Sequence, residues 1–252
     1  DDMVSRGLGD VYKRQVHVKA VKRLIQYVYN TRNYGIQYKR DSGMDTNTPK
    51  IFGQGRHPKD NGKNHMTVFT DSDYAADESK RSTQGSIVFM NGGPISWSSV
   101  LGKTICLSTC EAEVMAAVAA SKEAIHLKLL LGELGINHDK LIIEEDNAAC
   151  IAQAKGGLRF IRKAKHYQIA LRFIQKLHVD GEVEFKYCET KEQIADLFTK
   201  ALDEPKFTYF RDKIMYRPAS EGKNPRFSWL YPKWVLGPFW AFSSPPNQPQ
   251  RE

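Results

Sequence analysis

Four acidic side chains stand where predicted secondary-structure elements begin or end, which is where side chains from distant parts of a chain can meet. Asp71 and Asp146 each follow a strand-like apolar run. Glu113 lies in the first turn of a predicted helix, at the head of a stripe of small and apolar residues, and Asp196 borders the apolar face of a later helix. Carboxylates that converge repel one another, so a hard divalent cation is their natural partner. Two such ions would activate a water molecule and stabilise the leaving oxygen in phosphodiester cleavage.

Each acid also has a simpler structural explanation. Glu113 would favour the positive end of the helix dipole, Asp146 would serve as an N-cap, and Asp196 would be an ordinary surface carboxylate. Asp73 shares a strand face with Asp71 and remains an alternative to it. No lysine or arginine in the same short stretches is expected to neutralise the acids, and four of them in one basic chain favour the metal site.

The elements that would position these acids follow from apolar periodicity and from turn residues. We predict strands at 66–71, 82–90, 95–99, 141–145 and 182–187, and helices at 108–134, 147–155, 165–179 and 190–202. Capping boxes are expected at the start of two helices, Ser108 with Glu111 and Thr190 with Gln193. Three strands in antiparallel style, followed by alternating helices and strands, predict an α/β protein with a mixed sheet and helices on its faces.

The composition bounds the class of protein. A chain of 252 residues, 41% of them hydrophobic, can fill one globular core and leaves residues over at both ends. Its formal charge of +8 favours a polyanionic partner, of which nucleic acid is the commonest. The four cysteines are scattered without zinc spacing, which indicates a reduced intracellular protein, and no apolar run reaches the ~20 residues of a bilayer-crossing helix. We therefore expect no membrane partner.

The chain is expected to divide into five segments. Residues 1–15 lack periodicity and are interpreted as a non-native leader, 16–40 contain an amphipathic basic helix, and 41–64 form a linker. The core occupies 65–216. Residues 217–252 hold seven of the eleven prolines and are predicted to be a disordered Pro/Trp-rich tail, with a partner-binding tail as the alternative.

Several spaced motifs resemble a known family. In chain order they are FTDSDYA, SIVFMNGGPISWSS, STCEAEVMAAVAASKEAIHLKLLLGELGI, LIIEEDNAACIAQAK, KAKHYQIALRFI and ETKEQIADLFTKAL. Together they resemble the ribonuclease H domain of the Pol polyprotein of copia-type LTR retrotransposons. The earlier stretch HVKAVKRLIQYVYNTRNYGIQY resembles the terminal helix and connection segment of the reverse transcriptase that precedes this domain.

The resemblance implies a ribonuclease H-like α/β fold, with a five-stranded mixed sheet of order 3-2-1-4-5 flanked by helices. It also implies hydrolysis of the RNA strand of RNA·DNA hybrids during reverse transcription, with two Mg²⁺ ions or Mn²⁺ in their place. Carried over by motif, Asp71, Glu113, Asp146 and Asp196 are the catalytic, metal-binding acids.

The partners implied by the resemblance are an RNA·DNA hybrid and the reverse transcriptase domain of the same polyprotein. The implied location is a cytoplasmic virus-like particle or the nucleus, and the oligomeric state stays open. Hybrid contacts should involve phosphates and 2′-hydroxyls, with candidates Lys80, Arg81, Ser82, Thr83, Lys103, Lys165 and His166. Each basic residue is alternatively a solvated surface charge, and His166 a helix-capping or core histidine.

Two departures from the family pattern bear on activity. Ala148, Ala149 and Cys150 stand where the family commonly has a polar run, and no histidine lies in the loop 188–191. All four acids are present, but the sequence lacks a start and carries an implausible tail, so a catalytically inactive nucleic-acid-binding remnant is the alternative function. A different nuclease on the same fold, such as an integrase-like enzyme, is disfavoured. The predicted helix of Glu113 lies between the third and fourth strands, which is where the ribonuclease H family places its acidic residue.

Overall fold

The computed structural model describes residues 2–36, 38, 64–136, 140–156 and 167–216. They divide into two compact units, one within 1–36 and 201–236 and the other within 37–200 and 237–252. The two units are described separately below. The predicted residues Lys165 and His166 lie outside the described residues.

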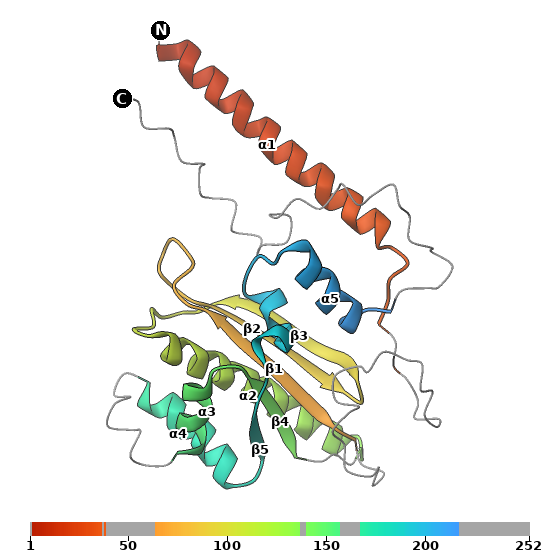
Figure 1. Cartoon of the computed structure of the whole chain (residues 1–252), viewed down its shortest axis with the longest axis vertical. Coiled ribbons are helices and arrows are strands. Elements are labelled where there is room, and N and C mark those ends of the chain that lie inside the picture. The colour runs from red at the N-terminus through yellow and green to blue at the C-terminus, as the bar shows by residue number, and fades with distance from the viewer. Residues whose placement is uncertain (1, 37, 39–63, 137–139, 157–166, 217–252) are drawn as a thin grey trace. The chain divides into compact units, whose positions relative to one another are not determined.

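A five-stranded mixed sheet forms the larger unit, with the order β3-β2-β1-β4-β5 (Figure 1). Its strands are β1 (Met66–Asp73), β2 (Thr83–Met90), β3 (Gly93–Leu101), β4 (Leu141–Glu145) and β5 (Val183–Tyr187). The first three pair antiparallel, whereas β4 lies parallel to both β1 and β5. Asn91 and Gly92 both have positive φ angles, as a tight hairpin turn between β2 and β3 requires. The predicted mixed α/β sheet and its strand order are confirmed.

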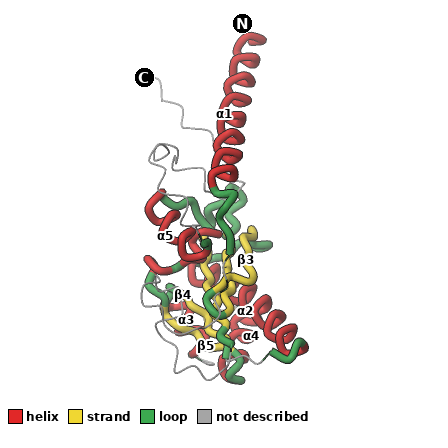
Figure 2. The backbone as a smooth tube through the Cα atoms, turned by 90° about the vertical axis from the view of Figure 1, so that its right-hand side faces the viewer, coloured by secondary structure: helices red, strands yellow, loops and turns green. Residues whose placement is uncertain are grey.

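Three helices cover one face of this sheet (Figures 1 and 2). They are α2 (Thr109–Glu133), α3 (Ala148–Lys155) and α4 (Gln168–Val179). Helix α2 places the buried alanines Ala117, Ala120 and Ala124 in the core cluster, and their small side chains let the helix approach β1 and β2 closely. Ser108 caps α2 by accepting a hydrogen bond from the Glu111 backbone amide at 3.1 Å.

The other half of the predicted capping box differs. The Glu111 carboxylate accepts from the backbone amide of Leu107 at 2.8 Å, and not from that of Ser108. The carboxylate therefore fixes the chain one residue before the cap, where it orders the entry to α2.

After β5 come two short 3-10 helices, η2 (Thr190–Glu192) and η3 (Ile194–Phe198), and η3 packs against β1 and β2 on the face opposite the three helices. The prediction of one helix from 190 to 202 is wrong, because Gln193 adopts an extended conformation (φ −72°, ψ 92°) between them. The capping box of Thr190 with Gln193 is therefore absent. Close approach of η3 depends on Gly85 in β2, where an added Cβ atom would lie 3.0 Å from the Ala195 carbonyl oxygen.

The smaller unit contains α1 (Asp2–Asn30) and α5 (Glu204–Ile214). Tyr27 of α1 and Phe207 of α5 make an edge-to-face ring contact with centroids 6.1 Å apart. Helix α1 includes residues 2–15, although the sequence of this stretch shows no apolar periodicity. The limits of the five segments predicted from the sequence stay predictions. No helix among the described residues combines the length and apolar character needed to cross a membrane.

Candidate active site

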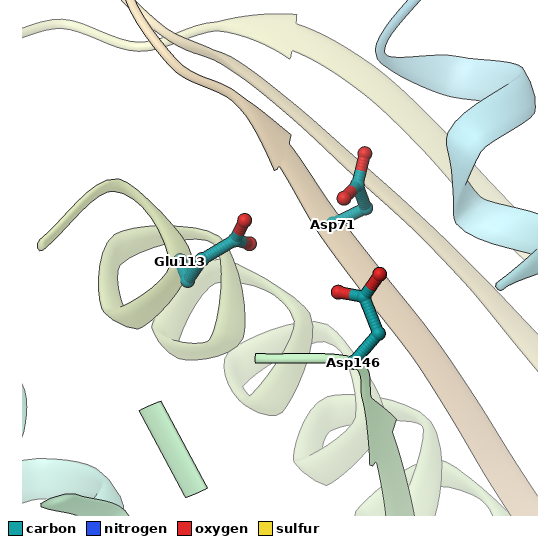
Figure 3. Close-up of side chains that lie close together, drawn as sticks. All are labelled: Asp71, Glu113 and Asp146. Atoms are coloured by element: carbon teal, nitrogen blue, oxygen red, sulfur yellow. The ribbon is translucent and has the colours of Figure 1, made fainter. Parts of the chain in front are cut away.

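Three of the four predicted acids meet at one edge of the sheet. Asp71 is near the end of β1, Asp146 directly follows β4, and Glu113 lies in the first turns of α2. One carboxylate oxygen from each lies within 4.8 Å of the other two, and Figure 3 shows the three side chains directed toward a shared space. Because β1 and β4 are parallel neighbours, their carboxyl-terminal ends reach the same edge, and the start of α2 supplies the third acid.

The fourth acid, Asp196 in η3, is not a member of this three-carboxylate group but is linked to it by a lysine. The Lys200 ammonium lies 2.7 Å from Asp196 Oδ1 and 3.5 Å from Asp71 Oδ2. Lys200 lies just outside the short stretches in which no neutralising lysine or arginine was expected, so the acids have a cationic partner that the sequence reading did not include. Lys200 stands four residues after Asp196, and that i,i+4 spacing is the signal that could have revealed it.

Burial and mutual repulsion dominate the electrostatics of the group. Burial raises the pKa of Asp71 to about 6, although Lys200 opposes the shift. Burial, and then the charges of Asp71 and Asp146, raise the pKa of Glu113 to about 9. Oε2 of Glu113 is buried and has no hydrogen-bond partner among the described residues. The site thus brings together several negatively charged oxygen donors beside one ammonium group, that of Lys200. A divalent cation would balance the remaining negative charge.

The segment after β5 holds the strand ends in place. Gln193 is fully buried, and its side-chain amide donates to the carbonyl oxygen of Thr70 in β1 at 3.0 Å and to that of Glu144 in β4 at 3.5 Å. The Thr199 hydroxyl donates to Asp71 Oδ2. Gln193 and Thr199 therefore position the strands and one acid, a role that sequence reasoning missed because it depends on contacts between distant parts of the chain.

Asn147, and not Asp146, is the N-cap residue of α3. The Asn147 side chain accepts from the backbone amides of Ala149 and Cys150, both at 3.0 Å, which leaves the Asp146 carboxylate directed at the acidic group. Glu145 is a buried neighbour that the sequence did not single out: its Oε1 accepts from the Asn147 amide at 3.1 Å. Burial, and then Glu113, raise the pKa of Glu145 well above its usual range.

Asp73, the alternative to Asp71, is half-buried and is not one of the three grouped carboxylates. Burial is the main reason why its pKa is also raised. The structure therefore gathers Asp71 rather than Asp73.

The predicted nucleic-acid contacts have different environments. Ser82 is buried, and its hydroxyl accepts from the Ala75 amide at 3.2 Å. Arg81 is half-buried and donates to Ser79 at 2.8 Å, whereas Lys103 is exposed. Of the other candidates, Lys80 is exposed and Thr83 is buried.

No protein-family model matches the chain. It is 33% identical over 147 residues to the "Retrovirus-related Pol polyprotein from transposon TNT 1-94" of Nicotiana tabacum, which covers 58% of this chain and 11% of the relative. It is 30% identical over 200 residues to that from transposon RE1 of Arabidopsis thaliana, which covers 79% of this chain and 12% of the relative. The chain thus spans about a tenth of the length of these polyproteins. The resemblance to retrotransposon Pol polyproteins is confirmed.

Other comparisons reach shorter or more distant proteins. The "Secreted RxLR effector protein 161" of Plasmopara viticola is 35% identical over 112 residues, or 44% of this chain and 65% of the relative. Among solved structures, LC11-RNase H1 isolated from compost has a TM-score of 0.43 at 14% identity and covers 54% of this chain and 92% of its own. The N-terminal RNase H domain of a Mycobacterium tuberculosis protein has a TM-score of 0.39 at 14% identity, covering 54% and 95%.

Proposed function

We propose that this chain, a homologue of part of the Pol polyproteins of plant transposons, is a metal-dependent endonuclease of the ribonuclease H type that hydrolyses the RNA strand of RNA·DNA hybrids during reverse transcription. The observation that carries the proposal is the meeting of Asp71, Glu113 and Asp146 at the edge of a sheet of order 3-2-1-4-5.

The donor set fits the metal that the proposal requires. All three grouped side chains offer carboxylate oxygens, the ligands that Mg²⁺ prefers, and Oε2 of Glu113 has no hydrogen-bond partner within the described chain. We propose that Asp71, Glu113 and Asp146, joined by Asp196, hold two Mg²⁺ ions, with Mn²⁺ as a substitute. When bound, the ions would activate the attacking water and stabilise the leaving oxygen.

The residues of the chain prepare this site in specific ways. Thr199 fixes the Asp71 carboxylate through its hydroxyl, and Asn147 takes over the cap of α3 so that Asp146 is available. Gln193 ties β1 to β4 and thereby sets the spacing of the two aspartates at the carboxyl-terminal ends of these strands. Such preorganisation lets the site receive a charged substrate without rearranging at the moment of reaction.

The substrate and context belong to the same proposal. A net charge of +8 attracts a polyanion without regard to sequence, and exposed Lys103 is one candidate for a phosphate contact. The proposed partners are an RNA·DNA hybrid and the reverse transcriptase domain of the same polyprotein, in the intracellular particle of a retrotransposon. The alternative is a remnant that binds hybrids without cleaving them.

Cleavage of an end-labelled RNA·DNA hybrid in Mg²⁺, followed on a denaturing gel, tests the proposal. Wild-type protein should cut the RNA strand, and Asp146→Asn should lower the rate by at least about a hundredfold while hybrid binding persists. Asp180→Asn makes the same chemical change at the exposed end of α4 and should cleave normally. Hybrid binding without cleavage by the wild-type protein would establish the remnant instead, and full activity of Asp146→Asn would exclude the acidic group as the active site.

A further inference from the structure

We propose that Lys200 determines how tightly the acidic site binds cations: its ammonium group holds a cation position between Asp71 and Asp196, and a divalent cation that binds there has to displace it. The inference rests on the proposed function in one respect, namely that the acidic site takes a divalent cation.

The contacts of Lys200 place one positive charge against two buried carboxylates. Its Nζ lies 2.7 Å from Asp196 Oδ1 and 3.5 Å from Asp71 Oδ2. The side chains of Asp196 and Asp71 are 0% and 3% exposed, so water screens these charges little. The ammonium therefore does for this pair of acids what a metal ion would do.

The same contacts make Lys200 a competitor. Asp71 is also a member of the three-carboxylate group, and its Oδ2 already accepts the Thr199 hydroxyl. A divalent cation held by the Asp71 carboxylate would stand a few ångströms from the ammonium, and like charges at that distance repel strongly in a weakly screened site. Either the cation binds less tightly or the ammonium leaves Asp71.

Lys200 has the freedom to leave. Its side chain is 37% exposed, so the flexible four-carbon stem can carry the ammonium into solvent while the carboxylates stay buried. Thr199 can keep its hydroxyl on Asp71 during this exchange, because a neutral donor does not repel the incoming cation. A divalent cation can thus displace the Lys200 ammonium, whereas Thr199 keeps its hydrogen bond to Asp71.

Isothermal titration of the full chain with MgCl₂, without nucleic acid, tests the exchange. Lys200→Met removes the charge and keeps the length of the side chain; it should bind Mg²⁺ about tenfold more tightly than the wild type. The control is Lys176→Met, because Lys176 also pairs with an acid four residues away, at 2.6 Å, but on the exposed surface of α4. Its Mg²⁺ affinity should equal that of the wild type.

Thermal unfolding gives a second readout, independent of cleavage. In EDTA, Lys200→Met should melt at a lower temperature than the wild type, because two buried carboxylates lose the ammonium that they share. Addition of Mg²⁺ should raise its melting temperature by more than that of the wild type. Lys200→Gln, which keeps a hydrogen-bond donor without the charge, should show the same pattern if Lys200→Met folds poorly.

Mg²⁺ binding by folded Lys200→Met or Lys200→Gln that is equal to or weaker than wild type would overturn the exchange and leave Lys200 as a structural tie. That result is separable from failure of the nuclease proposal: tighter Mg²⁺ binding without any hybrid cleavage would support the exchange and reject the nuclease. Absence of Mg²⁺ binding by every variant would overturn both.

Discussion

Replacing Glu113 with glutamine should stabilise the metal-free protein, by an amount that grows with pH. Glu113 is 8% exposed, and burial is the main cause that raises its pKa from an ordinary 4.5 to about 9. An acid whose pKa is higher in the folded state destabilises that state once pH exceeds its unfolded pKa, and the destabilisation increases until pH reaches the folded pKa. At pH 7 the chain stands about 2.5 pH units above the unfolded value, which at about 1.4 kcal/mol per unit amounts to about 3 kcal/mol.

Urea unfolding in EDTA at pH 5 and pH 7 measures this effect. Glu113→Gln should gain less than about 1 kcal/mol at pH 5 and about 3 kcal/mol at pH 7, both relative to the wild type. Glu133→Gln changes the same chemistry at the exposed end of α2 and should show little pH-dependent difference. The stabilised Glu113→Gln protein should nevertheless bind Mg²⁺ more weakly, because it has lost a ligand.

A stability difference between Glu113→Gln and the wild type that is the same at both pH values would refute this reasoning. It would mean that Glu113 ionises in the folded protein as easily as in the unfolded chain, so that neither burial nor the neighbouring carboxylates oppose its charge. Loss of stability at pH 7 would refute it more strongly, because the carboxylate would then be a net support of the fold.

Three further predictions concern the same site. Mg²⁺ affinity of the wild type, measured by calorimetry, should rise between pH 5.5 and 7.5, because Asp71 with a pKa of about 6 must lose its proton to bind; an affinity that is flat over this range would contradict the site. Gly85→Ala would place a methyl group 2.6 Å from Thr199 Cγ2 and should lower the free energy of unfolding by about 1–3 kcal/mol, whereas Gly132→Ala, with nothing within 4 Å, should not destabilise. Gln193→Leu should cost about 1–3 kcal/mol in urea unfolding and reduce hybrid cleavage, because it leaves strand carbonyl oxygens without their donor; wild-type stability would show that these hydrogen bonds are dispensable.

Local patterns in the sequence were sufficient to predict most strands of the sheet. The strand at 141–145 has the predicted bounds, because a short apolar run is closed by acidic and capping residues on one side. The turn at Asn91 and Gly92 was predictable because few other residue pairs accept two positive φ angles. Both features depend on neighbours in the chain, which periodicity and turn chemistry describe.

The segment from 190 to 200 shows what local patterns cannot supply. Its apolar spacing is that of a helix, but Gln193 breaks the helix in two by placing its amide between carbonyl oxygens of β1 and β4. Lys200 contacts Asp71, far away in sequence, through an ion pair that the acids alone did not reveal. These contacts decide the geometry of the acidic site, and they arise only when the segment from 190 to 200 packs against β1 and β4.

The hydrogen bond from Thr199 to Asp71 joins residues 128 positions apart. During translation it can therefore form only after most of the larger unit has been synthesised. The nascent polypeptide carries Asp71, Glu113 and Asp146 long before Thr199 has been translated. Until then Asp71 lacks its hydroxyl donor and its ammonium neighbour. A polypeptide that ends before residue 190 would therefore lack Gln193, Thr199 and Lys200, the residues that complete the surroundings of the acidic group.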